Sequence, residues 1–300
     1  MPRPILIAGP TASGKSRLAI ELARRFRGVV VNVDSMQVYR ELRILTARPT
    51  AEDEAEVPHR LYGHVPAGER YSVGRWLGDL AETLAEARTD GLRPIIVGGT
   101  GLYFTALTRG LAAVPPIPAE VRATLRGQSE GVASAELHAR LAAIDGEGAA
   151  TTRPSDRTRI LRALEVFTAT GRSLPEWKRA AAAPPLIDPA TAAKVVLSPD
   201  RALLHQRIAE RAGHMIRAGA LAEVDALARL GLDPELPAMK AIGVRELIGH
   251  NAGKLSIDEA LAAIRTETRR YAKRQMTWFR GQMPDWPVVE DDEAALRAFA

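Results

Sequence analysis

The sequence predicts an α/β protein in which a parallel sheet is flanked by helices and a helical domain is inserted. Short apolar strands alternate with amphipathic helical segments, which is the pattern of a parallel, doubly wound sheet. The first strand, Pro4–Ala8, runs directly into a glycine-bearing loop and then into a helix with an apolar stripe. Proline-rich boundaries near 114–118 and 183–189 enclose a stretch with helical periodicity and almost no strand signal. We therefore expect a core of residues 1–114 and 193–300 and a helical insertion of residues 115–192.

The loop after the first strand matches the phosphate-binding pattern G-x-x-x-x-G-K-[ST]. Its backbone N–H groups, with a helix dipole behind them, suit an anion. Lys15 adds a point charge for the outer phosphate, and the Ser16 hydroxyl is the expected Mg²⁺ ligand. The motif predicts a P-loop NTPase-like sheet that binds a di- or triphosphate, and it leaves open what is done with that ligand. The predicted phosphate-binding residues are Gly9, Pro10, Thr11, Ala12, Ser13, Gly14, Lys15 and Ser16.

Two further strands, Gly28–Asp34 and Arg93–Thr100, place polar side chains at their carboxyl ends. Because ligands of such sheets bind at that edge, Asp34, Ser35 and Thr100 are expected to share one crevice with the phosphate loop. Asp34 can be the Mg²⁺ ligand of a hydrolase or kinase, a general base near the phosphate site, or a structural cap of the next turn. Thr100 stands among glycines that permit close approach of a ligand, although strand-to-helix turns often carry glycine for structural reasons.

The second half of the chain continues the same pattern. A helix is predicted over residues 156–170 within the insertion, and a fourth strand follows at 194–197. The next helix carries Arg207 and Arg211 on one face. These arginines can point at transferred or leaving phosphates, or they can be solvated. A long helix from about residue 258 to 280 closes the core.

The composition is that of an ordinary globular protein, with 300 residues of which 46% are hydrophobic and 26% charged. No apolar run approaches the roughly 18 residues of a membrane span. The start, Met1-Pro2-Arg3, leads straight into the first strand, so we expect no signal segment. The absence of cysteine excludes disulfides and cysteine–zinc sites and suits a reducing cytoplasm. The net charge of +5 is compatible with nucleic acid, with another polyanion, or with no specific partner.

Basic residues gather in two segments. Residues 265–280 hold six Lys or Arg against a single acidic residue, with aromatic residues among them. Residues 153–172 hold five Arg against two acidic residues. A solvated helix face normally mixes signs, so these one-sided patches favour a polyanion, and aromatics among arginines suit stacking on unpaired bases. An ordinary solvated face, with some of the aromatics in the core, is the alternative.

Six segments together resemble the bacterial tRNA dimethylallyltransferase (tRNA isopentenyltransferase) family. They are GPTASGKS at 9–16, DSMQVY at 34–39, VGGTGLYF at 97–104, RILRALEV at 159–166, KAIGVRE at 240–246 and AKRQMTWFR at 272–280. The resemblance implies transfer of a dimethylallyl group from dimethylallyl diphosphate, with Mg²⁺, to N6 of the adenosine 3′ of the anticodon. The phosphate loop then holds the diphosphate of the prenyl donor rather than a nucleoside triphosphate.

The resemblance also implies roles and partners. Asp34 becomes the base that takes a proton from the adenine amino group, with Thr100 beside it. Together with Lys15 and Arg211 at the phosphates, they are the predicted catalytic residues. The target adenine must leave the anticodon stack to be reached. We expect a cytoplasmic monomer whose partners are dimethylallyl diphosphate and the tRNA anticodon stem-loop. The predicted tRNA contacts are Asp34, Ser35, Met36, Gln37, Thr100, Asp156, Arg157, Thr158, Arg159, Ile160, Lys240, Gly243, Arg245, Arg270, Lys273, Arg274, Gln275, Trp278 and Arg280.

Two departures from the family pattern limit what is carried over. Residues 41–49 are ELRILTARP where the family usually has GMDIGTAKP, so no role is assigned to that loop. Thr158 stands where a glutamine is common. The alternative function is a P-loop kinase that binds ATP and phosphorylates a small molecule or nucleoside, but it gives no reason for the basic, aromatic helix near the C-terminus. A non-catalytic RNA-binding protein is a third hypothesis, which the loop together with Asp34 disfavours.

Overall fold

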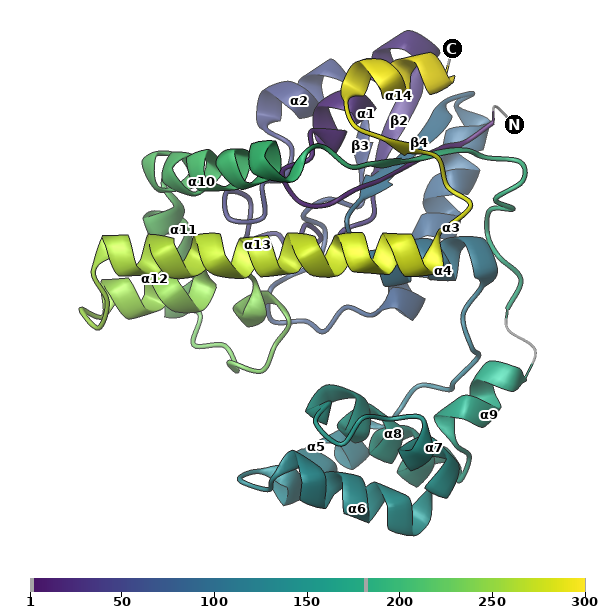
Figure 1. Cartoon of the computed structure of the whole chain (residues 1–300), viewed down its shortest axis with the longest axis vertical. Helices are drawn as coiled ribbons and strands as arrows, with labels where there is room; N and C mark the ends of the chain where they lie inside the picture. Colours follow the sequence, from purple (N-terminus) through teal and green to yellow (C-terminus); the bar gives the residue numbers. More distant parts are fainter. Residues whose placement is uncertain (1–2, 181–182, 300) are drawn as a thin grey trace. The chain divides into compact units, whose positions relative to one another are not determined.

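The computed structural model describes residues 3–180 and 183–299, and within them six strands form one parallel sheet (Figure 1). The strands lie in the order β3-β2-β4-β1-β5-β6, and β1 pairs in register from Ile5 with Ile95 to Ala8 with Gly98. The predicted α/β fold with a parallel sheet flanked by helices is confirmed. The strands are β1 Ile5–Ala8, β2 Gly28–Asn32, β3 His59–Arg60, β4 Arg93–Gly98, β5 Ala193–Leu197 and β6 Val288–Val289.

The helices account for most of the remaining described chain. They are α1 Lys15–Phe26, α2 Ala51–Glu56, α3 Val73–Thr89, α4 Gly101–Arg109, α5 Ala119–Ser129, α6 Ser134–Ile144, α7 Gly146–Ala150, α8 Arg157–Thr170, α9 Leu174–Arg179, α10 Arg201–Arg217, α11 Ala220–Arg229, α12 Val244–Asn251, α13 Ile257–Gln282 and α14 Asp292–Phe299, with a 3₁₀ turn at Ala238–Lys240. No helix among the described residues combines the length and the apolar character that crossing a bilayer requires.

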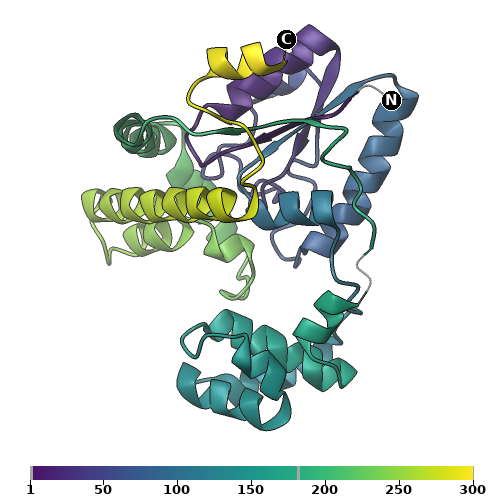
Figure 2. The ribbon, with the colours of Figure 1, turned by 45° about the vertical axis from the view of Figure 1, so that its right-hand side comes forward.

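Alternation along the strands gives the sheet two apolar faces. In β1, Ile5 and Ile7 face a cluster that includes Leu18 and Leu22 of α1 and a residue of α14, whereas Leu6 and Ala8 face the larger cluster. Helices α1 and α14 therefore cover one face together (Figure 2). The larger cluster contains buried side chains of α3, α4, α11, α12 and α13.

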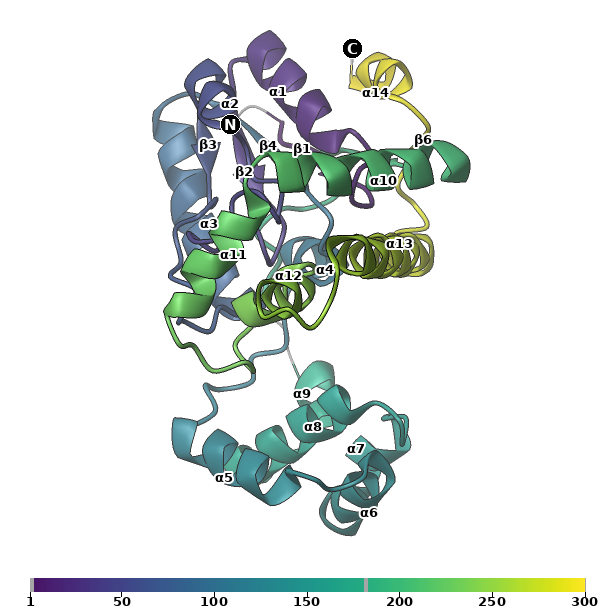
Figure 3. The same cartoon turned by 90° about the vertical axis from the view of Figure 1, so that its left-hand side faces the viewer.

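The long helix α13 packs along α10 on one side and α12 on the other, as the view in Figure 3 shows. Its N-terminus has a capping box in which the Ser256 hydroxyl accepts from Glu259 N and the Glu259 carboxylate accepts from Ser256 N. Ile264 and Phe279 are buried at its two ends. The helix thus brings a sequence-distant segment beside the phosphate loop.

The described chain divides into two compact units, residues 1–108 with 186–300 and residues 109–185. The boundaries expected from the sequence, 115 and 192, lie a few residues further along the chain. The second unit contains helices α5–α9 around a small apolar core that includes Leu137, Leu141 and Ile160. At the exit from the first unit Ile187 N donates to Leu107 O at 3.3 Å, and at the base of the second unit Ala183 N donates to Leu111 O at 3.3 Å.

Candidate active site

The phosphate loop connects β1 to α1 with two residues in left-handed backbone conformations. Gly14 has φ 99° and Ala12 has φ 64°, and this path turns the loop around a hollow at the start of the helix. Lys15 folds back so that its Nζ donates to Pro10 O at 3.1 Å. Burial lowers the pKa of Lys15 to about 8, while the neighbouring Asp34 carboxylate opposes this shift and the Arg211 guanidinium adds to it.

Two arginines of α10 reach the same loop. Arg211 Nη2 donates to Thr11 Oγ1 at 2.6 Å, and Arg207 Nη1 donates to Ser13 O at 3.2 Å. Their spacing of four residues places both on one face of the helix. Burial lowers the pKa of Arg211 from its ordinary value, and Asp34 opposes this shift. Lys15, Arg207 and Arg211 therefore bring three cations to the loop, as an anionic ligand requires. Two carboxylates lie nearby, Asp34 and Asp292, and a Cβ on Gly14 would be 3.3 Å from Asp292 Oδ1.

Gln275 ties the phosphate loop to the turn after β4. Its Oε1 accepts from Thr11 N at 2.9 Å, and its Nε2 donates to Gly99 O at 2.9 Å. The side chain is only 5% exposed. A Cβ on Gly99 would lie 2.1 Å from Gln275 Nε2, so this close approach requires glycine at that position.

Asp34 follows β2 and is held by Asn32, a fully buried amide at the end of that strand. Asn32 Oδ1 accepts from Asp34 N at 2.9 Å, and Asn32 Nδ2 donates to Asp34 O at 3.0 Å. Trp76 Nε1 in turn donates to Asn32 O at 3.0 Å. One carboxylate oxygen of Asp34 accepts from Met36 N at 2.9 Å and from Gln37 N at 3.4 Å. The carboxylate is thereby oriented by backbone groups on its own segment.

Thr100 joins this segment from the neighbouring strand. Ser35 N donates to Thr100 Oγ1 at 3.1 Å. The approach depends on Gly98, since a Cβ there would lie 2.1 Å from Val33 O. Tyr271 of α13 completes the group: burial raises its pKa, with Asp34 acting in the same direction, while hydrogen bonding with Thr100 and Gln275 opposes the shift.

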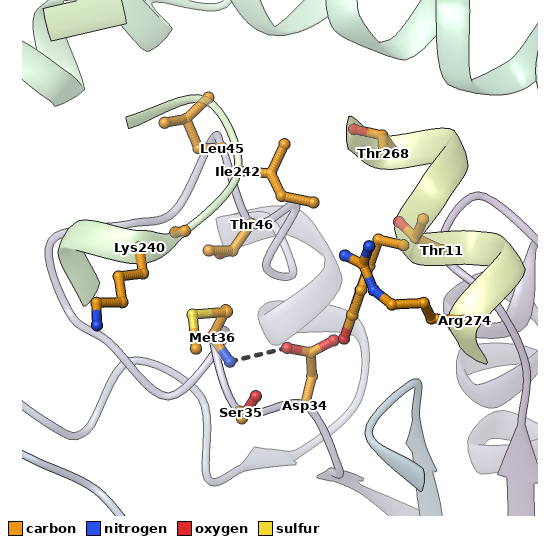
Figure 4. A pocket seen from close by; sticks show the side chains of 12 residues that line it. Thr11, Asp34, Ser35, Met36, Leu45, Thr46, Lys240, Ile242, Thr268 and Arg274 are labelled. Carbon is orange, nitrogen blue, oxygen red and sulfur yellow. Dashed lines mark hydrogen bonds between the residues drawn. The ribbon is translucent and has the colours of Figure 1, made fainter. Parts of the chain in front are cut away.

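Asp34, Ser35 and Tyr271 line a pocket of about 260 Å³ (Figure 4), whereas Thr100 is not among its lining residues and reaches it only through its bond with Ser35 N. Figure 4 shows Asp34, Ser35 and Met36 on one side and Thr268 and Arg274 of α13 on another. Leu45, Thr46 and the segment around Lys240 supply further wall. Segments far apart in the sequence therefore line one pocket together with Asp34. The complete lining is Thr11, Asp34, Ser35, Met36, Leu45, Thr46, Lys240, Ala241, Ile242, Thr268, Tyr271 and Arg274.

Many of the predicted RNA-contact residues fall into three places. The pocket receives Asp34, Ser35, Met36, Lys240 and Arg274. A larger groove of about 850 Å³, between α10 and α13, is lined on α13 by Arg269, Arg270, Lys273 and Arg280, as well as by Pro10 of the phosphate loop. The residues predicted at 156–160 belong to the second unit.

Other predicted contact residues have structural surroundings of their own. Gln37 Nε2 donates to Thr46 O at 2.8 Å and Ala47 O at 3.0 Å. Gly243 has φ 102° at the start of α12, and Arg245 beside it is exposed. Trp278 packs where a side chain on Gly101 would clash.

The start of α8 carries the predicted contacts of the second unit. Asp156 caps the helix by accepting from Arg159 N at 3.1 Å, and Thr158 and Arg159 are exposed beside it. The guanidinium of Arg157 instead donates to Val132 O at 2.6 Å and also to Ser129 O. Arg157 is therefore engaged in holding its own unit together.

Two residues predicted to contact RNA, Ile160 and Gln275, have buried side chains. Ile160 is 0% exposed within the core of the second unit, so its side chain packs there and does not face a ligand. Gln275 uses its buried amide to join two loops of the first unit. Both lie inside sequence motifs whose neighbouring residues are exposed, and the motif does not distinguish the inner from the outer face of its helix.

Sequence reasoning missed Asn32 and the bridging hydrogen bonds of Gln275. Asn32 was visible as one polar residue at the end of the apolar run Gly28–Val31, a position where a buried amide needs partners. Gln275 is separated in the sequence from its partner Thr11 by 264 residues and from its partner Gly99 by 176 residues. No local sequence pattern predicts such a contact.

A metal at this site would depend largely on its ligand's own oxygens. The described part of the chain contains no group of three or more His, Cys, Asp or Glu side chains able to hold a metal ion. Ser16 is exposed at the first turn of α1, beside the phosphate loop. Mg²⁺ usually keeps several waters and binds through one or two protein groups plus phosphate oxygens, so these residues fit a Mg²⁺ that arrives with a diphosphate.

Fold and site together define a phosphate-loop protein whose anion site and strand-end carboxylate lie side by side. A family model described as IPP transferase matches residues 37–282, and one described as isopentenyl transferase matches residues 3–64. The chain therefore belongs to the IPP transferase family, and the resemblance seen in its motifs is confirmed.

Curated relatives match along nearly the whole chain. A tRNA dimethylallyltransferase of Nitrobacter hamburgensis is 55% identical over 97% of this chain and 92% of its own length. That of Methylocella silvestris is 53% identical over 99% and 97%. Among solved structures, a eukaryotic dimethylallyltransferase acting on tRNA has a TM-score of 0.81 at 27% identity, covering 99% of this chain and 77% of that one. A tRNA isopentenylpyrophosphate transferase from Bacillus halodurans has a TM-score of 0.67 at 31% identity, with coverage of 97% and 90%.

Proposed function

We propose that this chain transfers a dimethylallyl group from dimethylallyl diphosphate to N6 of the adenosine 3′ of the anticodon in tRNA. The observation that carries the proposal is that Asp34 lines one pocket with Thr11 of the phosphate loop, whose hydroxyl accepts from Arg211 Nη2 at 2.6 Å. A carboxylate able to accept a proton thus stands beside cations able to hold a leaving diphosphate. The kinase alternative is not favoured, because the curated relatives over nearly the full length are named dimethylallyltransferases.

The cationic loop prepares the leaving group. In this proposal the backbone of residues 9–16 surrounds the diphosphate, while Lys15 and Arg211 neutralise the charge that develops as it departs. Arg207 and Arg211 also fasten the loop itself through Ser13 O and Thr11 Oγ1. Mg²⁺, held by Ser16 and the diphosphate oxygens, would supply further charge neutralisation.

Asp34 acts as the base in the same step. The N6 lone pair attacks C1 of the donor, a C–N bond forms, and the C1–O bond breaks as diphosphate leaves. The proton of the amino group passes to the Asp34 carboxylate. Asn32, Met36 N and Thr100 keep that carboxylate and its segment in place. The adenine reaches it by leaving its stack and entering the pocket.

The exposed basic residues would hold the RNA. Arg274 and Lys240 line the pocket itself, and Arg270, Lys273 and Arg280 line the neighbouring groove. In the second unit, Thr158 and Arg159 are the exposed candidates. Phosphate contacts of this kind provide affinity that falls with salt. A monomeric, cytoplasmic enzyme is part of the same proposal, and light scattering of the purified chain tests the monomer.

Transfer of labelled dimethylallyl from its diphosphate tests the function directly. We expect label in an unmodified tRNA with adenosine 3′ of the anticodon and none in a matched tRNA with guanosine there. Asp34→Asn should lower the rate by about 10²–10⁴-fold, the usual contribution of a general base, while tRNA affinity is kept. Label absent from tRNA while ATP is consumed would overturn the proposal in favour of a kinase. Equal loss of rate and tRNA affinity in D34N would instead assign Asp34 to RNA positioning.

A further inference from the structure

Three consecutive backbone N–H groups in the divergent loop converge on one carboxylate. Arg43 N and Ile44 N each donate to Glu223 Oε2 at 2.7 Å, and Leu45 N donates to Glu223 Oε1 at 2.9 Å. Glu223 lies in the first turn of α11, a favourable place for an acidic side chain. Successive N–H groups of this kind form an anion-binding concavity, and here the protein fills it with its own side chain.

The same loop is a wall of the target pocket. Leu45 and Thr46 line that pocket opposite α13. Leu45 is 8% exposed and fits against Gly243, where an added Cβ would come within 2.9 Å of Leu45 Cδ2. On its other flank the loop receives both hydrogen bonds of the Gln37 amide, at Thr46 O and Ala47 O. A shift of residues 43–46 would therefore change the pocket and the segment that follows Asp34.

Local contacts alone do not fix this wall. The Arg43 guanidinium donates to Pro49 O at 2.7 Å and pairs with Glu54 Oε2 of α2 at 3.1 Å, and Thr46 Oγ1 donates to Leu42 O. All of these partners lie within about a dozen residues of the loop in the sequence. Glu223 is separated from Arg43 by 180 residues, and its three bonds join the loop to α11. Bonds from N–H groups to a charged acceptor are also the stronger kind.

We infer that Glu223 is a positioning residue that holds the 43–46 wall of the pocket in the shape that admits the target nucleotide. The inference rests on the proposed function, since it takes RNA as the ligand of that pocket. Thr11 of the phosphate loop lines the same pocket, but the loop has its own fastenings through Gln275, Arg207 and Arg211 and none to residues 43–46 among the described hydrogen bonds. Loss of the Glu223 bonds should consequently affect the RNA substrate and spare the prenyl donor.

Steady-state kinetics of Glu223→Gln with both substrates tests the inference. Glutamine keeps the shape but presents an NH₂ group to backbone donors, so at least one of the three bonds is lost. We expect KM for tRNA to rise about tenfold, the order expected for losing a hydrogen bond to a charged acceptor, with kcat and KM for dimethylallyl diphosphate nearly unchanged. Asp225→Asn is the matched control, because Asp225 lies on the same helix and, among the residues that the structure describes, pairs with the exposed Arg229 alone.

The outcomes separate the inference from its rivals. Unchanged KM for tRNA in E223Q, or an equal rise in both KM values, would overturn it and leave Glu223 a residue of general stability. If E223Q does not fold, Glu223→Asp keeps the charge at shorter reach, and it should show a smaller selective rise in KM for tRNA; no rise would overturn the inference. A wild-type chain that labels no tRNA would refute the proposed function itself, a result distinct from either.

Discussion

Gln275→Ala tests whether the bridge between the phosphate loop and the turn after β4 is what holds the donor site together. The substitution removes two hydrogen bonds at once and leaves Gly99 O and Thr11 N without their partner. Gly99 O is in a buried bond, whereas Thr11 N is partly accessible to water. An orphaned buried group costs about 1–3 kcal/mol, and the second, wetter group costs less. We expect the free energy of unfolding to fall by about 2–4 kcal/mol.

Gln275→Glu sharpens the same prediction. A carboxylate at this place can still accept from Thr11 N, but its second oxygen would face Gly99 O where Nε2 now donates at 2.9 Å. Two acceptors would then oppose each other in a buried position. The Gln275→Glu variant should therefore lose at least as much free energy of unfolding as Gln275→Ala. Urea unfolding measures both variants, and calorimetric titration with dimethylallyl diphosphate should show at least tenfold weaker binding because the loop loses its brace.

The control is Thr277→Ala on the same helix, whose exposed hydroxyl donates to Lys273 O within α13. It should change stability by less than about 0.5 kcal/mol. If Q275E is as stable as the wild type and binds the donor equally well, the bridge stabilises neither the fold nor the donor site, and the reasoning is refuted.

Three further predictions concern charge and close packing. The pKa of Lys15 is about 8 before any ligand binds, so donor affinity should be greatest below pH 8 and fall as the pH rises through it. Lys15→Arg should flatten this fall in affinity. An unchanged pH dependence in that variant would exclude Lys15 as the cause of the fall. Gly98→Ala should lower the stability measured by thermal unfolding by about 1–3 kcal/mol or more, because its Cβ would press on Val33 O. The control Gly78→Ala in α3, where a Cβ has nothing within 4 Å, should be neutral or stabilising by up to about 1 kcal/mol. Equal effects of the two substitutions would contradict the packing argument. Arg274→Ala should weaken tRNA binding and reduce its salt slope by about one, as filter binding at several salt concentrations can measure, and unchanged affinity would make Arg274 an ordinary surface residue.

Sequence periodicity was sufficient for the elements that bury a continuous face. The strands at the centre of the sheet and the helices α8 and α13 lie within a few residues of their predicted bounds, and α1 follows the phosphate loop as expected. The edge strands β3 and β6 were not predicted, because each has only two residues and depends on a neighbouring strand for its pairing. Periodicity requires a longer run than that.

The candidate site was predictable to the extent that it follows strand ends. Asp34 and Thr100 could be placed together because parallel strands end at one edge, and the bond of Thr100 with Ser35 N agrees with that placement. The bracing of the site could not be predicted. Gln275 and Glu223 act across more than a hundred residues through a few atoms, and neither the composition nor the spacing of their own helices records the partner.

The hydrogen bond between Ile187 N and Leu107 O marks the place where the core must close upon itself after residues 109–185. For a flexible excursion of that length, loop closure would cost about 4 kcal/mol in chain entropy. The excursion is not flexible once its helices form, because Ala183 N and Leu111 O bring its two ends together. Folding of residues 109–185 therefore shortens the effective loop that separates α4 from β5. The insertion consists of locally connected helices, which form quickly. Weakening the small core of the insertion around Leu141 should therefore slow assembly of the sheet, although the sheet contains no residue of the insertion.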